Sequence, residues 1–389
     1  MVYATEDSNS KSHETKTVAG SDAYARTWDL PVRIFHWALA ASFGAAWLAT
    51  GDRYLYFHLF AGTLIAGLLL FRLFWGWLGE PNARFRDFGF GWKPLWRYLR
   101  DLIGRHPSRF VGHNPAGAWI IWLMFALLLS LVITGALTLG GEERHGPFVG
   151  WVRFPIGVKL HQVHATLAWV MVGVVCAHLF GVLIESLLHR ENLVASMVTG
   201  RKRLLREVVT VRRRGGVALS LVLTMALFAA WWFQGYLYQA PGSSHLPLAG
   251  PDLPDDPVWR KVCGECHLAY HPSLLPARSW KKLMQQTSDH FGEDLALEPK
   301  QAVAIRDFLI ANSAEQEATE AAWKINSNEA ASQTPLRITG LRYWKWKHSR
   351  IIESVWQRPS VNNRGNCVAC HHDARQGTFE DSAIKVPKS

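Results

Sequence analysis

The chain has 389 residues, of which 49% are hydrophobic and 12% aromatic, and its formal net charge is +11. The positive excess lies in the first half, because residues 239–389 hold 18 Lys/Arg against 17 Asp/Glu. Since the excess accompanies long apolar segments, it indicates membrane topology and contact with anionic lipid, and it argues against a nucleic-acid-binding protein.

Residues 1–27 are polar and lack an apolar stretch, so we predict a cytoplasmic N-terminal tail and no cleavable signal peptide. Five apolar segments then follow, each near the length of about 20 residues that crosses a bilayer. They cover residues 34–50, 55–78, 116–139, 160–184 and 215–238. The pattern predicts an all-α fold class, a transmembrane helical bundle, rather than the buried helices of a large soluble domain.

The loops between these segments differ in charge. Residues 79–115 hold seven Lys/Arg and residues 185–214 hold eight, whereas residues 51–54 and 140–159 hold one and three. Positive loops collect on the cytoplasmic side. We therefore expect a multi-pass protein of the bacterial inner membrane, with a cytoplasmic N-terminus and a periplasmic C-terminal part.

Histidines inside the apolar segments are candidates for function, since a titratable side chain is costly in a membrane without a partner. His164 and His178 are 14 residues apart, close to four helical turns, so they share one helix face about 21 Å apart. When histidines at the same depth in the membrane are paired, His36 and His178 form the site of an inner haem b. His58 and His164 form the site of an outer haem b. Two histidine ligands leave no open iron position, which suits electron transfer.

Several neighbouring residues leave alternatives open. His161 lies one turn before His164 and is either the ligand in its place or a propionate contact. Arg33 and Arg72 either neutralise haem propionates or are ordinary interfacial arginines. Cys176 is interpreted as a small packing residue.

Two Cys-x-x-Cys-His runs near the C-terminus are the attachment signature of c-type haem. In each run, two thioether bonds hold the porphyrin and the adjacent histidine is an axial ligand. The residues are Cys263, Cys266 and His267 in the first run, and Cys367, Cys370 and His371 in the second. Because this haem is attached outside the bacterial cytoplasm, the runs agree with the orientation predicted from charge.

The organisation beyond the bundle follows from composition. A Pro/Gly-rich linker at 241–257 separates the fifth helix, at 211–240, from a mainly helical domain at 258–389. Helices are predicted at 280–288, 299–312 and 341–357. The polar stretch 313–335 is predicted to be a flexible surface excursion.

Residues 27–206 resemble the membrane cytochrome b family that serves nickel–iron hydrogenases and related bacterial dihaem cytochromes b. The resemblance rests on Trp28-Asp-Leu-Pro-Val-Arg-Ile-Phe-His36-Trp, Phe71-Arg-Leu-Phe-Trp-Gly-Trp, Gly112-His-Asn-Pro-Ala-Gly and Thr199-Gly-Arg-Lys-Arg. It implies two b haems in a four-helix dihaem core at 28–210, to which the fifth helix is added.

Residues 258–387 resemble the small dihaem cytochrome c family, through Cys263-Gly-Glu-Cys-His, Leu274-Leu-Pro-Ala-Arg-Ser-Trp280, Asp289-His-Phe-Gly and Asn366-Cys-Val-Ala-Cys-His. The resemblance implies two histidine ligands for each haem c. Sequence spacing then favours His290 as the second ligand of the first haem c and His348 for the second. His271 and His372 are the alternatives, and Met284 is less favoured.

Two haem b and two covalently attached haem c predict an electron path from the membrane to the periplasm. The leading hypothesis is transfer between quinone and a periplasmic redox protein, either as a quinol:cytochrome c-type oxidoreductase or as an electron carrier. An alternative is a cytochrome b relay and anchor subunit for a periplasmic hydrogenase or dehydrogenase. A third is direct chemistry at a haem, which requires an open axial position. The sequence leaves open whether the chain forms a homo-oligomer.

Overall fold

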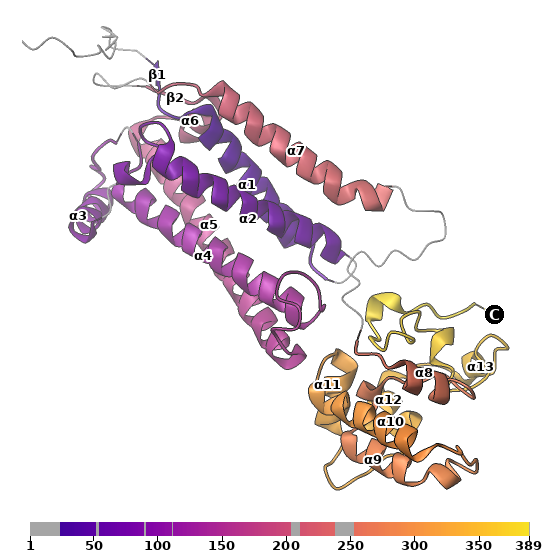
Figure 1. Cartoon of the computed structure of the whole chain (residues 1–389). Helices are drawn as coiled ribbons and strands as arrows, with labels where there is room; N and C mark the ends of the chain where they lie inside the picture. The colour runs from indigo at the N-terminus through magenta and orange to yellow at the C-terminus, as the bar shows by residue number, and fades with distance from the viewer. Residues whose placement is uncertain are drawn as a thin grey trace, which may run out of the picture. The chain divides into compact units, whose positions relative to one another are not determined.

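The computed structural model describes most of the chain (Figure 1). The described residues are 24–51, 54–88, 91–110, 112–203, 211–237 and 253–388. Most of the predicted N-terminal tail and of the linker at 241–257 therefore lies outside them.

The chain forms two compact units. The first comprises Met1–Leu48, Phe60–Leu129 and Trp169–Trp231, and the second comprises Ala49–Leu59, Ser130–Ala168 and Trp232–Ser389.

The apolar part of the described chain forms long helices, which Figure 1 shows. They are α1 (Leu30–Leu48), α2 (Leu55–Leu78), α4 (Pro115–Gly141), α5 (Phe154–His189) and α7 (Gly215–Leu237). Shorter elements connect them: η2 (Phe85–Asp87), α3 (Trp92–Ile103) and α6 (Leu193–Thr199). The five predicted apolar segments are therefore helical, which confirms the all-α class.

The helices of the first unit pack through large apolar side chains. Phe35 of α1, Leu68 of α2 and Leu221 of α7 form a buried cluster. Phe125 of α4 packs against it, with its ring stacked 6.5 Å from that of Phe35. These contacts bring α1, α2, α4 and α7 together as one bundle.

Four of the described helices are long and apolar enough to cross a membrane: α2, α4, α5 and, over Gly215–Gln234, α7. The chain is therefore an integral membrane protein. Helix α1 has 19 residues, but Arg33 and His36 in its first two turns make it less apolar. Its crossing of the membrane stays a prediction.

One small sheet lies beside the start of α1. Strand β1 (Tyr24–Arg26) pairs antiparallel with β2 (Arg201–Arg203), and Arg26 stands directly opposite Arg201. The backbone N–H of Thr27 donates to the carbonyl of Gly200, which continues the pairing toward α1. The sheet thereby ties the segment after α6 to the start of α1.

The C-terminal residues of the second unit fold as short helices around one apolar core. The α-helices are α8 (Pro257–Cys263), α9 (Ala277–Gln285), α10 (Pro299–Ala311), α11 (Glu320–Asn328), α12 (Arg342–Lys347) and α13 (Glu353–Trp356). The 3-10 turns are η3 (Pro272–Leu274), η4 (Thr287–Asp289), η5 (Ala314–Gln316), η6 (Ile338–Gly340), η7 (Cys367–Ala369) and η8 (Asp381–Ala383). Trp259, Leu275, Ile305 and Leu341 are among the side chains buried at the centre of the core.

Two predictions for this region need correction. The stretch 313–335 is not a surface excursion, because it contains η5 and α11, and Ala314, Ala321 and Ile325 are buried in the core. The predicted helix at 341–357 is two short helices, α12 and α13, and α12 ends just before His348. The helix predicted at 299–312 is confirmed as α10, and α9 starts and ends three residues before the predicted 280–288.

Candidate functional site

His58, in the first turn of α2, lies opposite His164 of α5. The centroids of the two rings are 5.9 Å apart. A metal–imidazole bond is about 2 Å long and a ring centroid lies roughly 1 Å beyond its nitrogen, so two rings on opposite sides of one metal ion are about 6 Å apart. The pair therefore fits a shared iron ion, as sequence depth predicts.

The ring of His164 is oriented by α4. Its Nδ1 lies 3.1 Å from the carbonyl oxygen of Leu131 and 3.1 Å from the hydroxyl of Thr134. A carbonyl oxygen only accepts, so Nδ1 carries the hydrogen and Nε2 keeps the lone pair that binds a metal. A Cβ at Gly135 would lie 3.1 Å from Cε1 of His164, so the glycine makes room for the ring.

His161 takes a different partner from His164. Its Nδ1 lies 2.7 Å from the carboxylate of Glu142, and its side chain is 62% exposed. The ring next to His58 is thus that of His164. This geometry favours His164 over His161 as a metal ligand.

His36 of α1 and His178 of α5 belong to the same unit and interact electrostatically. The Nδ1 of His36 is buried and has no hydrogen-bond partner within the described residues. A buried imidazole without a partner is costly unless another group occupies the site. His36 therefore has a buried ring nitrogen left for another group, and its pairing with His178 stays a prediction.

His113, to which the sequence assigned no role, lies near this pair. Its ring packs between Trp28, at 4.8 Å, and Phe88, at 4.5 Å. Burial, with a smaller effect of the positive charge of Arg72, lowers the pKa of His113 to about 3, so the ring is neutral. The motif Gly112-His-Asn is the sequence signal that could have indicated a role for His113. Its position in a loop, outside the apolar segments, gives no such indication.

The two arginines proposed as propionate contacts have different surroundings. The guanidinium of Arg72 is buried over the ring of Phe85, at 4.7 Å, and its Nη1 has no hydrogen-bond partner within the described part of the chain. Arg33 instead donates to the carbonyls of Met197 and Val198 at the end of α6. Arg72 therefore retains a donor for an acidic group, whereas Arg33 is already engaged.

Cys176 of α5, which the sequence analysis interprets as a small packing residue, is exposed. It does not fill the interior of the first unit, so the interpretation as a packing residue gains no support from contacts within the chain.

The two Cys-x-x-Cys-His histidines each face the distal histidine predicted for them. The ring centroids of His267 and His290 are 6.3 Å apart, and those of His348 and His371 are 6.1 Å apart. Both separations match the spacing of about 6 Å for two imidazoles on one metal ion. In each pair the two histidines are 23 positions apart in sequence, and the fold brings their rings to the separation expected of two ligands of one metal ion.

Hydrogen bonds to the backbone orient one ring of each c pair. The Nδ1 of His267 lies 2.7 Å from the carbonyl of Leu268, and that of His348 lies 2.9 Å from the carbonyl of Trp344. Each bond assigns the hydrogen to Nδ1 and leaves Nε2 for a metal. Burial lowers the pKa of His348, which keeps its imidazole in the neutral, metal-binding form.

The four cysteines of the two runs are free thiols. Cys263 and Cys367 are partly buried, and burial raises the pKa of each to about 11. Cys266 is exposed, and Cys370 is partly buried. The arrangement of two thiols beside a ligand histidine fits covalent attachment of a porphyrin.

The alternatives to His290 and His348 are engaged elsewhere or exposed. Both nitrogens of His271 have partners, the hydroxyl of Ser273 at 2.9 Å and the carbonyl of Pro254 at 3.2 Å. His372 is exposed, and Met284 packs against the apolar core. The geometry therefore favours His290 and His348.

Comparison with known proteins divides the chain into two parts. Residues 27–200 match the family model described as prokaryotic cytochrome b561, and residues 259–379 match that described as dihaem cytochrome c. Together the two matches cover most of the described residues.

Curated relatives resemble the first part. A probable Ni/Fe-hydrogenase B-type cytochrome subunit from Rhizobium leguminosarum bv. viciae is 28% identical over 225 residues, which are 49% of this chain and 92% of that protein. A probable Ni/Fe-hydrogenase 1 B-type cytochrome subunit from Escherichia coli (strain K12) is 23% identical over 210 residues, 44% of this chain and 88% of that protein.

Among solved structures, the dihaem cytochrome c from Rhodobacter sphaeroides is similar to the C-terminal part. It is 35% identical, covers 33% of this chain and 100% of that chain, and has a TM-score of 0.30.

Proposed function

We propose that the chain connects the quinone pool to a periplasmic redox protein, because residues 27–200 match the prokaryotic cytochrome b561 model and residues 259–379 match the dihaem cytochrome c model. Electrons pass through two b haems in the membrane and two c haems outside it. Quinol oxidation is the favoured direction.

The observation that carries this proposal is the repeated histidine geometry. Three pairs that the sequence predicts have ring centroids 5.9, 6.3 and 6.1 Å apart. His58 and His164 form the b pair among them, and each c pair joins a Cys-x-x-Cys-His histidine to a distal one. Pairs of this kind support six-coordinate haems, which transfer electrons without binding substrate at the iron.

The protein's own residues hold and tune these groups. Backbone carbonyls fix the rings of His164, His267 and His348, and Arg72 offers a buried cation in the same unit as the inner pair. A haem, when bound, supplies one-electron chemistry. Ligand orientation, burial and nearby charge set the potential at which it does so.

The proposed topology places the haems in series. The excess of Lys/Arg in residues 79–115 and 185–214 supports a cytoplasmic N-terminus. With five spans, residues 258–389 are periplasmic, on the side of His58 and His164. The outer b haem is then the one nearer the c haems along the path.

The experiment is reduction of the purified, fully oxidised protein by a quinol, followed by absorbance of the b and c haems. We expect quinol to reduce the b haems and the electrons to reach the c haems. The proposal fails if quinol reduces neither type of haem and if chemically reduced protein passes no electrons to quinone.

A second candidate follows from the names of the relatives in Rhizobium leguminosarum and Escherichia coli, which are B-type cytochrome subunits of Ni/Fe-hydrogenases. The chain would then relay electrons for, and anchor, a periplasmic metalloenzyme. Isolation from native membranes separates the two candidates, because a stoichiometric metalloenzyme partner favours the anchor and a haem protein without one favours the quinone-linked path.

A further inference from the structure

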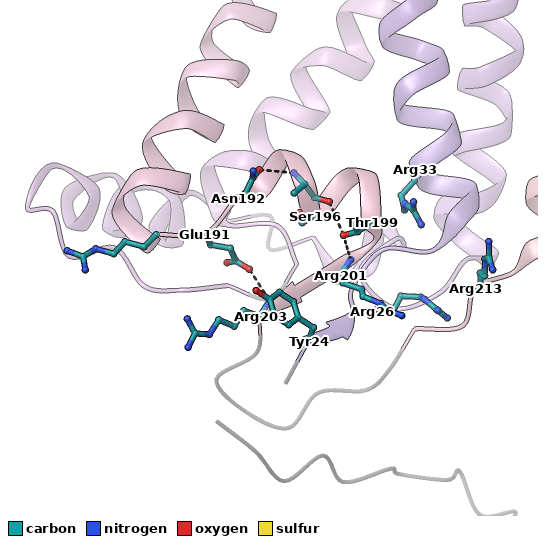
Figure 2. Close-up of a pocket in the computed structure, with 12 residues that line it drawn as sticks. Tyr24, Arg26, Arg33, Glu191, Asn192, Ser196, Thr199, Arg201, Arg203 and Arg213 are labelled. Carbon is teal, nitrogen blue, oxygen red and sulfur yellow. Dashed lines mark hydrogen bonds between the residues drawn. The ribbon is translucent and has the colours of Figure 1, made fainter. Parts of the chain in front are cut away.

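A cavity of about 640 Å³ lies beside the small sheet in the first unit (Figure 2). Its volume falls within the range of about 300–1,000 Å³ that is usual for small-molecule sites. Six arginines line it: Arg26, Arg33, Arg190, Arg201, Arg203 and Arg213. Such a concentration of one charge within a cavity predicts an anionic occupant.

Among the described residues that line the cavity, the one carboxylate is already used. Glu191 pairs with Arg109 at 3.0 Å, and it accepts a hydrogen bond from the backbone N–H of Arg203 at 3.2 Å. Figure 2 draws the second of these bonds. Glu191 is therefore engaged outside the group formed by Arg26, Arg201 and Arg213.

The fold forces some of these charges together. Arg26 and Arg201 are directly opposite each other across the β1–β2 pair. Like charges in this position are destabilising. The charges of Arg26 and Arg213 also act unfavourably on Arg33. An anion in the cavity relieves both repulsions.

A second, apolar cavity of about 340 Å³ shares one lining residue, Arg33, with the first. Its other lining residues come from α1 and the end of α6: Leu30, Ile34, Trp37, Ala38, Met197 and Val198. Positions 30, 34 and 38 repeat every four residues, so they share one face of α1. A charged cavity beside an apolar groove, with an arginine common to both, has the two parts that an amphiphile requires.

We propose that these two cavities together bind a phosphate-bearing amphiphile, an anionic membrane phospholipid. Its phosphate lies among the arginines, which recognise phosphate oxygens through forked N–H donors. One acyl chain follows the groove along α1. A free phosphate satisfies the arginines but leaves the groove without a role, which is why the lipid is the favoured source.

The test uses the purified full-length protein in detergent, with native mass spectrometry as the readout. Separate titrations use dioleoylphosphatidylglycerol, dioleoylphosphatidylcholine and inorganic phosphate. We expect the anionic lipid to bind more tightly than either of the others. Equal binding of the two lipids overturns the charge argument, and phosphate binding as tight as the anionic lipid overturns the lipid assignment.

The variant pair is Arg201→Gln with Arg213→Gln, compared with Arg97→Gln with Arg100→Gln on the exposed face of α3. Both double variants lose two positive charges. The cavity variant should bind the anionic lipid about thirtyfold more weakly, and the α3 variant should change little. The proposal fails if the two double variants weaken binding equally.

The single variant Arg201→Gln provides a second test in case the double variant does not fold. It should retain the wild-type haem spectrum and bind the anionic lipid about fivefold more weakly. A wild-type affinity in this variant, with an unchanged haem spectrum, contradicts the proposal.

Discussion

The Nδ1 of His164 and the carbonyl oxygen of Leu131 lie 3.1 Å apart, across the contact between α5 and α4. This bond directs Nε2 of His164 toward the space shared with His58, whose ring centroid is 5.9 Å away. The same device recurs at His267 and His348, where carbonyls of Leu268 and Trp344 take the Nδ1 hydrogen. Each of the three close pairs thus contains one ring whose metal-binding nitrogen is fixed by the backbone.

Replacing His164 and His161 separately tests the assignment of the outer b ligand. His164→Ala should lower the haem b content from two to one per chain, since the ring facing His58 is lost. His161→Ala should retain both, because His161 pairs with Glu142 instead. Haem quantification of the purified variants provides the measurement, and the reverse pattern would make His161 the ligand.

Gly135→Leu tests the space that α4 leaves for His164. Because even a Cβ at Gly135 would approach Cε1 of His164 to 3.1 Å, a larger side chain must displace the ring. We expect loss or a changed spectrum of one b haem, with the c haems unchanged.

Gly173→Leu on α5 is the matched control, since a Cβ there meets nothing within 4 Å. Equal effects of the two glycine variants on the b-haem spectrum would show that displacement of His164 is not the cause.

His348→Ala tests distal ligation in the second c site. The porphyrin should stay attached through Cys367 and Cys370, while the iron loses its sixth ligand and binds carbon monoxide when reduced. The wild-type protein should bind none at any haem. Carbon monoxide binding by the wild type would instead favour direct chemistry at a haem.

The control for this experiment is His372→Ala, because His372 is exposed and adjoins the same run. It should leave the reduced protein unable to bind carbon monoxide. If His372→Ala opens a haem and His348→Ala does not, the distal ligand is misassigned.

Ile325→Ala tests the corrected description of residues 313–335. Ile325 is 2% exposed within the core, so its truncation should cost about 2–5 kcal/mol of unfolding free energy. Ile352→Ala, at a position 66% exposed, should change stability by about 0.5 kcal/mol or less. The measurement is denaturant unfolding followed by the c-haem absorbance. If residues 313–335 were a surface excursion, the two variants would have the same unfolding free energy.

The sequence predicts most strongly where one physical requirement dominates. The length of the apolar segments predicts the long helices, and the two Cys-x-x-Cys-His runs predict His267 and His371 as axial ligands. Residues 313–335 were harder, because their polar composition is typical of an exposed loop while Ala321 and Ile325, four positions apart, bury one helix face.

Other features depend on contacts that no local pattern encodes. The burial of His113 between Trp28 and Phe88 arises only when the loop before α4 meets the residues before α1 and α3. The arginine cavity likewise needs the pairing of Arg26 with Arg201, 175 positions later. In both cases the tertiary fold, not the local sequence, brings the groups together.

The most direct test of the central claim is rapid mixing of oxidised protein with quinol, followed at the b-haem and c-haem absorbance bands, in the wild type and in His164→Ala. The proposed path predicts that the b haems are reduced before the c haems, and that reduction of the c haems becomes slow or incomplete in the variant. Reduction of the c haems at an unchanged rate without the outer b haem would contradict it.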